Sequence, residues 1–384
     1  MHHQILPRII AQHIHDFLQL FSLRDLEYQF SFRLPGIRHP VKLQIREVET
    51  ANSLNILSID NSYGCMPDAC VNEPLPHILK AEKDAADSPA PLVWIYPMRE
   101  YTTSEGEALL REMNLGDHYI CDAINNGLPL SCVVSTDHFL KHTADPYRKS
   151  VLLSPVPENE AVTEKLKTFA AQGIGVLMYG TRNKLDTVPP FERLIKLDVQ
   201  EDPNLLREAL GKFGYFIGFE KKRPDVKPPT MGLVRRDNGL FLSVYNSNTT
   251  TTAKFRFPFG APILCGMEAE MEDSCSCYHF GRAEHRECRV FAEQQSGVIS
   301  CREAPPVNAR YRRAIRIRGL EDATVRLFSE KGCECAVSRG YGTDSTPLYD
   351  ERFEQVTDPL YGSYLLGKHV TGDILFLIGH HETR

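Results

Sequence analysis

The chain has 384 residues, of which 42% are hydrophobic and 24% charged, and its formal net charge is −6. This composition is typical of a globular protein with two or three domains, and it argues against a basic nucleic-acid-binding chain. No apolar run approaches the roughly 20 residues that cross a bilayer, and no secretory signal opens the chain. We therefore expect a cytoplasmic protein that binds neither nucleic acid nor membrane, with its 11 cysteines reduced.

The first segment, residues 1–88, is predicted to be a small α+β region. Ile10, Ile14, Phe17 and Phe21 recur at the spacing that places them on one helical face. Apolar and polar residues then alternate over residues 26–34 and 41–45, which indicates two strands.

The second segment, residues 89–225, alternates strands and helices. Strands are expected at residues 93–96, 132–135, 151–154, 175–179 and 215–219. A capping-box spacing at Ser104–Glu107 predicts a helix through Met113, and Asp117 is expected to cap a second helix. A further helix is predicted over residues 160–171, with Gly173 as its C-terminal cap. This alternation predicts a flavodoxin-like α/β domain, a parallel sheet with helices on both faces.

The third segment, residues 226–384, changes to a period of two. Phe255, Phe257 and Phe259 alternate with Lys254, Arg256 and Pro258, and Ile315 and Ile317 alternate with arginines. Short alternating strands separated by turn signals are typical of an antiparallel β-sandwich. The sequence thus predicts an α/β domain followed by an all-β domain.

Two stretches of the second segment carry a resemblance to a known family. Residues 147–155 read YRKSVLLSP, and residues 173–180 read GIGVLMYG after the intervening helix. This pattern, followed by a β-sandwich, resembles the part of family 42 β-galactosidases that follows the catalytic barrel. It is similar to their glutamine-amidotransferase-like trimerisation domain, although the usual paired glycines appear here as Gly173 and Gly175. The resemblance implies a non-catalytic domain that forms homotrimers.

Length limits what this resemblance transfers. A (β/α)₈ barrel takes about 250 residues, whereas the first segment holds 88, so barrel glutamates have no counterpart here. We expect the oligomerisation and β-sandwich portion of a glycoside hydrolase, or a stand-alone relative. The alternative is a non-catalytic scaffold or carbohydrate-binding subunit that associates with a separate barrel chain. Glutaminase activity is not expected, because residues 178–182 hold no cysteine nucleophile.

Polar residues follow three predicted strands, and ligands of open α/β sheets bind at the carboxyl ends of strands. Glu100 and Asp137 could form a catalytic carboxylate pair there, with Arg99, Tyr101 and Arg182 as ligand-binding residues. The plainer interpretation is that these residues are caps and surface charges.

A third candidate is a small hydrolase that uses Asp60 and Glu73, since paired carboxylates perform glycosidase acid–base chemistry. Its alternative is a structured loop. No glycine-rich phosphate loop is present, so no nucleotide cofactor is expected. The pairs Cys275/Cys277 and Cys333/Cys335 could together supply four sulfurs to zinc, but structural zinc sites usually separate paired cysteines by two to four residues. We expect no metal.

Overall fold

A computed structural model describes residues 28–32, 41–45, 54–58, 90–103, 107–220, 228–236, 239–245, 250–281, 283–330, 332–358 and 361–381. The chain divides into two compact units, one of residues 1–209 and 227–234 and the other of residues 210–226 and 235–384. In the first unit, β1 (Tyr28–Phe32), β2 (Val41–Ile45) and β3 (Leu54–Ser58) form a small antiparallel sheet.

The first unit is built around a parallel sheet with the strand order β5-β4-β6-β7-β8. The strands are β4 (Leu92–Tyr96), β5 (Cys132–Ser135), β6 (Val151–Pro155), β7 (Gly175–Gly180) and β8 (Leu194–Asp198). The helices are α4 (Met98–Thr103), α5 (Glu107–Asn125), α6 (Thr136–Lys141), α7 (Glu160–Ala171), α8 (Arg182–Thr187) and α9 (Asn204–Lys212), with a 3-10 turn, η1 (Asp145–Tyr147). If these strands are numbered 1 to 5 along the chain, their order across the sheet is 2-1-3-4-5. The direction in which successive strands are added therefore reverses between β4 and β6.

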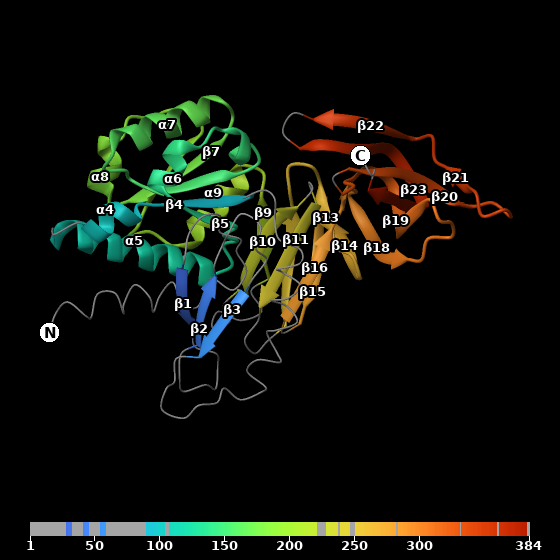
Figure 1. Ribbon diagram of the computed structural model, residues 1–384, viewed down its shortest axis with the longest axis horizontal. Helices are drawn as coiled ribbons and strands as arrows, with labels where there is room; N and C mark the ends of the chain where they lie inside the picture. Colours follow the sequence, from blue (N-terminus) through green and yellow to red (C-terminus); the bar gives the residue numbers. More distant parts are fainter. Residues whose placement is uncertain are drawn as a thin grey trace. The chain divides into compact units, whose positions relative to one another are not determined.

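Helices cover both faces of this sheet, with α5 and α7 on opposite sides (Figure 1). On one face, Val93 packs in a buried core with Phe139 of α6 and Leu166 of α7. On the other face, the Tyr96 hydroxyl donates a hydrogen bond to Asp117 of α5 at 2.9 Å. The predicted parallel α/β region is confirmed.

Helix α5 runs without a break through residue 117, so the prediction that Asp117 caps a second helix was wrong. Glycine and aspartate are poor helix formers, which is why the sequence indicated an end there. Both residues serve packing instead. A Cβ on Gly116 would lie 2.8 Å from the ring of Tyr179, and Asp117 is buried against Tyr96.

The last strand of the parallel sheet is also not the expected one. β8 completes the sheet, whereas β9 (Phe216–Phe219) pairs antiparallel with β12 (Thr251–Arg256) in the second unit. Residues 194–198 mix apolar and charged side chains, which hid β8 from a search for apolar runs.

The second unit is an all-β region, as predicted. In its described residues, one twelve-stranded sheet contains the path β21-β20-β23-β19-β18-β14-β15-β12-β9, with β13, β17 and β22 attached beside it. The further strands of this sheet are β13 (Ala261–Ile263), β14 (Met267–Glu272), β15 (Cys275–Phe280), β17 (Val290–Glu293), β18 (Ser296–Ala304), β19 (Tyr311–Leu327), β20 (Cys333–Tyr341), β21 (Pro347–Tyr349), β22 (Phe353–Asp358) and β23 (Gly362–His381). Separately, β11 (Gly239–Tyr245) pairs with β16 (Ala283–Cys288), and β10 (Thr230–Arg236) spans the division between the units.

Strands β19 and β23 bend along their length. β19 pairs with β18 over residues 314–318 and with β17 over residues 324–327, and its register against β23 shifts between these stretches. Gly319 lies at the bend with a φ of +80°, where a Cβ would be 2.1 Å from the Val298 carbonyl oxygen. Bulges bend and twist a strand, so the sheet curves and does not extend as a flat ribbon.

Candidate functional site

A pocket opens in the first unit at the carboxyl ends of the parallel strands, and it spans the point where the winding reverses between β4 and β6. Its volume is about 620 Å³, including solvent at the mouth. The loops and helices after the strands supply Pro97, Glu100 and Tyr101 after β4, Thr136 after β5 and Val199 after β8. The strand ends supply residues 154–159 at the end of β6 and residues 179–181 at the end of β7. The helices supply Leu109, Glu112 and Gly116 of α5, Val162 of α7 and Lys184 of α8. The ends of all five strands of the sheet therefore contribute to one cavity.

Aromatic side chains form one wall of the pocket. Tyr101 and Tyr179 line it directly. Behind them, the Trp94 indole donates a hydrogen bond to the Tyr179 hydroxyl at 2.9 Å, and the ring of Tyr96 lies edge-on to Tyr101 with centroids 5.4 Å apart. Burial raises the pKa of Tyr179 well above its ordinary value, so this wall is uncharged. Trp94, the only tryptophan of the chain, is one hydrogen bond away from the cavity.

Lys184 binds two of the three glutamates that line the pocket. Its ammonium forms ion pairs with Glu112 of α5 and with Glu158 after β6. Burial acts to lower the pKa of Lys184, but the hydrogen bonds and charges of both carboxylates outweigh it and raise the pKa. The lysine is therefore fully protonated, and it compensates the charge on that side of the pocket.

Glu100 is the third glutamate of the pocket, and its partner is neutral. Both of its carboxylate oxygens lie 3.0 Å from the Thr136 hydroxyl and share its single hydrogen. Within the described residues no cation pairs with Glu100. Ionised carboxylates accept several hydrogen bonds at once, so Glu100 keeps accepting capacity for a ligand.

Asp117 lies behind the aromatic wall. It is 7% exposed, and burial raises its pKa to about 7, although the hydrogen bond from Tyr96 lowers the pKa in part. A carboxyl group with this pKa titrates near neutral pH, unlike an ordinary aspartate.

The structure brings together some of the site residues expected from the sequence. Glu100 and Tyr101 line the pocket. Asp137 is exposed and lies 3.7 Å from the guanidinium of Arg99, and neither residue lines the pocket. Arg182 pairs with Asp198 at 3.2 Å and with Glu201 at 3.1 Å, also outside its lining. Asp60 and Glu73 lie outside the described residues.

Glu112, Glu158 and Lys184 line the pocket but were not predicted from the sequence. Glu158 follows β6, the strand next to the reversal point, and this position is the signal that could have identified it. Glu112 lies in helix α5 and Lys184 in helix α8, where charged residues are ordinarily part of a solvated face. Only their convergence in space distinguishes them.

The two Cys-x-Cys pairs lie far apart in the antiparallel sheet. Cys275 and Cys277 belong to β15, Cys333 and Cys335 to β20, and β23, β19, β18 and β14 lie between these strands. Neighbouring strands are about 4.8 Å apart, so the four sulfurs cannot share one zinc ion within this sheet. Across the described part of the chain, no cluster of three or more histidine, cysteine or acidic side chains could hold a metal.

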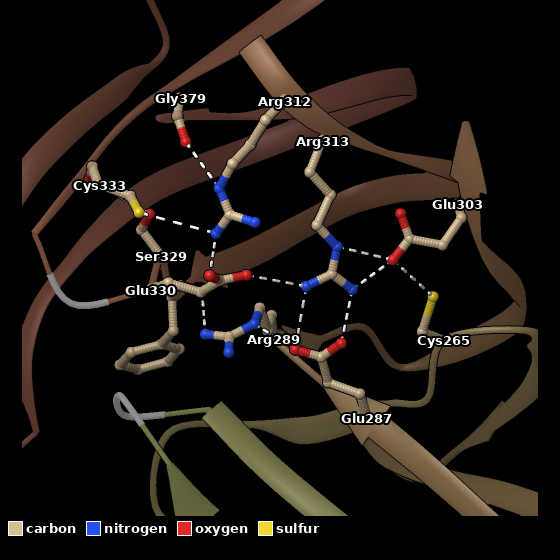
Figure 2. Close-up of polar contacts among 11 residues, drawn as sticks. Cys265, Glu287, Arg289, Glu303, Arg312, Arg313, Ser329, Glu330, Cys333 and Gly379 are labelled. Atoms are coloured by element: carbon tan, nitrogen blue, oxygen red, sulfur yellow. Dashed lines mark hydrogen bonds and ion pairs between the residues drawn. The ribbon is translucent and has the colours of Figure 1, made fainter. Parts of the chain in front are cut away.

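The second unit contains a dense network of charges, the Arg313 cluster, which comprises Arg289, Arg312, Arg313, Glu287, Glu303 and Glu330 (Figure 2). Arg313 donates to Glu303 at 2.8 Å and to both oxygens of Glu287 at 3.1 and 2.5 Å. Burial acts to raise the pKa of Glu287, but the hydrogen bonds and charges of Arg313 and Arg289 outweigh it, and the pKa lies below its ordinary value. Three cations balance three anions, so this cluster is a structural network with no excess charge for a ligand.

No helix in the described residues is both long enough and apolar enough to cross a membrane. No family model matches the sequence, and no curated protein matches it.

Three solved structures are similar to this chain at low identity. The exo-carrageenase GH42 from Bacteroides ovatus is 11% identical with a TM-score of 0.33, over 57% of this chain and 31% of that structure. The α-L-fucosidase isoenzyme 2 from Paenibacillus thiaminolyticus is 10% identical with a TM-score of 0.22, over 82% of this chain and 51% of that structure. The catalytic module of a family 98 glycoside hydrolase from Streptococcus pneumoniae is 9% identical with a TM-score of 0.12, over 51% of this chain and 36% of that structure. The chain thus spans 31–51% of these structures, and similarity at these TM-scores assigns it no function.

Proposed function

We propose that the pocket at the carboxyl edge of the parallel sheet binds a carbohydrate, and that this chain is a carbohydrate-binding protein of the glycoside hydrolase type. The observation that supports the proposal is Glu100, a carboxylate on the pocket wall with a neutral partner, next to Tyr101. Sugar hydroxyls donate to such a carboxylate, and charged acceptors form the stronger hydrogen bonds. The apolar surfaces of Tyr101, Pro97 and Val156 suit the C–H face of a sugar ring.

Binding is better supported than hydrolysis. Glycosidases use two carboxyl groups, one as acid and one as base or nucleophile. Of the three glutamates in the pocket, Glu112 and Glu158 both pair with Lys184. Glu100 is then the one described pocket carboxylate without a cation, so the lining does not offer two equally available groups.

The test uses Trp94 as a built-in reporter, because its indole is bonded to Tyr179 in the pocket wall. Galactose, glucose, lactose and cellobiose are titrated into the full chain while Trp94 emission is followed. A sugar that binds is expected to shift the emission in a saturable way. Glu100→Gln is expected to weaken binding about tenfold or more, since a hydrogen bond to a charged group contributes about 1.5–3 kcal/mol.

Asp137→Asn is the matched control, because Asp137 is an exposed carboxylate outside the pocket lining and its variant is expected to bind like the wild type. If no sugar changes the emission, or if Glu100→Gln binds as tightly as the wild type, the proposal is wrong. Nitrophenyl glycosides are assayed in parallel. Hydrolysis that disappears in Glu100→Gln would instead support the enzymatic alternative.

A further inference from the structure

His138 and His142 direct their imidazoles toward each other. Their Nε2 atoms are 2.6 Å apart, and the ring centroids are 4.2 Å apart with the planes tilted by 36°. The two residues are one helical turn apart, a spacing that places two side chains on the same face. In a hydrogen bond between them, one Nε2 carries the hydrogen and the other accepts it, so the two rings hold a single hydrogen between these atoms.

The backbone on both sides of this pair is fixed. The Ser135 side chain caps α6 by accepting from the His138 amide at 3.2 Å, and the His142 amide donates to the Phe139 carbonyl at 3.3 Å. Phe139 is fully buried, and its ring packs edge-on against Phe169 with centroids 5.4 Å apart. The imidazoles themselves are half-buried, so the site is preorganised and still reachable from solvent.

We propose that His138 and His142 form a two-imidazole chelate for a divalent transition metal, independent of the pocket and of the function proposed for it. Both rings then carry their hydrogen on Nδ1, and both Nε2 atoms offer a lone pair to the metal. With metal–nitrogen bonds of about 2.0–2.1 Å, two ligands at 90° lie about 2.9 Å apart, and two at the tetrahedral angle about 3.4 Å apart.

The observed separation of 2.6 Å is that of the hydrogen bond between the rings and is shorter than both values, so the rings must move apart to admit a metal, and the 90° arrangement requires the smaller movement. Square-planar and tetragonal nitrogen sites are typical of Cu²⁺ and Ni²⁺, whereas zinc sites are tetrahedral. The geometry therefore favours Ni²⁺ or Cu²⁺ over Zn²⁺. Because no cluster of three or more ligating side chains occurs in the described residues, solvent completes the coordination, and the metal exchanges with solution.

The test is calorimetric titration of the full chain with NiCl₂. His138→Gln and His142→Gln are each expected to lose the same Ni²⁺ site, because a chelate needs both rings. The double variant is expected to lose that one site and no further Ni²⁺ binding. His118→Gln, which removes an exposed histidine of α5, is the matched control and is expected to keep the site. Histidines elsewhere in the chain are unchanged in all variants. The proposal fails if the wild type binds no Ni²⁺, if either single variant binds like the wild type, or if the two losses add as independent sites.

A second measurement uses the wild type alone and does not depend on how the variants fold. Ni²⁺ is expected to protect His138 and His142 from diethyl pyrocarbonate, while His118 reacts as before, with the modified positions identified by mass spectrometry. Equal modification of His138 and His142 with and without Ni²⁺ would overturn the proposal. The same titration with ZnCl₂ is expected to show weaker binding, and tighter binding of Zn²⁺ would contradict the inferred 90° geometry.

Discussion

At the scale of single residues, Arg313 shows how one half-buried side chain can hold a network of charges together. Its guanidinium bonds Glu287, Glu303 and Glu330, which come from β16, β18 and the segment before β20 (Figure 2). Removing one member of a buried ion pair leaves an uncompensated charge and costs about 3–5 kcal/mol. Because Arg313 and Glu287 are each 18% exposed and Glu303 is 50% exposed, Arg313→Met is expected to lower the free energy of unfolding by less than this, to a value between the roughly 1 kcal/mol of an exposed pair and the cost of a buried one, in urea titrations.

Arg302→Met is the control for this experiment. Arg302 pairs with Glu268 at 3.1 Å, but its side chain is 64% exposed and that of Glu268 is 59% exposed. An exposed pair of this kind contributes below about 1 kcal/mol, so this variant is expected to unfold almost like the wild type. Equal losses in the two variants would show that the Arg313 cluster stabilises the fold no more than a surface pair.

The candidate site was only partly predictable at this scale. Glu100 and Tyr101 could be identified because they directly follow an apolar strand whose carboxyl end was clear from the sequence. Lys184 could not, because a lysine within a helix has no local feature that shows that it lies between Glu112 and Glu158. Pairing between distant positions depends on the tertiary fold.

At the scale of elements, helix α5 and strand β7 approach closely through Gly116. A methyl group on this residue would lie 2.8 Å from the Tyr179 ring, and Tyr179 is 2% exposed and cannot move into solvent. Gly116→Ala gains about 1 kcal/mol or less of helix propensity, but overpacking costs about 1–3 kcal/mol. We expect net destabilisation in urea titrations, together with a change in Trp94 emission, since Trp94 donates to Tyr179.

Gly211→Ala in α9 is the matched control. A Cβ there would have its nearest neighbour, the Cα of Phe216, at 3.9 Å, which is ordinary contact. This variant is expected to stabilise the protein by up to about 1 kcal/mol. If Gly116→Ala were stabilising as well, the close approach of α5 to Tyr179 would not constrain the helix.

Element types were mostly predictable, and two of the errors share one cause. Helix α7 occupies the predicted residues 160–171 because its apolar spacing and its cap agree with the tertiary structure. The predicted break in α5 and the assignment of residues 215–219 to the parallel sheet were wrong. In both cases a contact distant in sequence, Gly116 with Tyr179 and β9 with β12, overrode the local pattern.

At the scale of the whole molecule, the two units are expected to respond to pH in opposite directions. In the first unit, burial raises the pKa of Asp117 from 3.8 to about 7, so its stabilising contribution is complete below pH 3.8 and is lost as the pH rises through 7. In the second unit, the pKa of Glu287 lies below its ordinary 4.5. Its contribution is complete above pH 4.5 and is lost as the pH falls through the folded-state pKa.

Pulse-labelling hydrogen exchange across a urea series separates these responses, with samples equilibrated at each pH and labelled under one common condition. Peptides from β4 are expected to unfold at higher urea at pH 5 than at pH 8, because each pH unit between 5 and 7 changes the Asp117 contribution by about 1.4 kcal/mol. Peptides from β19 are expected to keep their midpoint over this range and to lose stability below pH 4.5. Asp117→Asn removes the first response and leaves the second, because an amide does not titrate. A single common shift of both peptides in the wild type would mean that the units do not unfold separately, or that these two carboxyl groups do not govern their pH dependence.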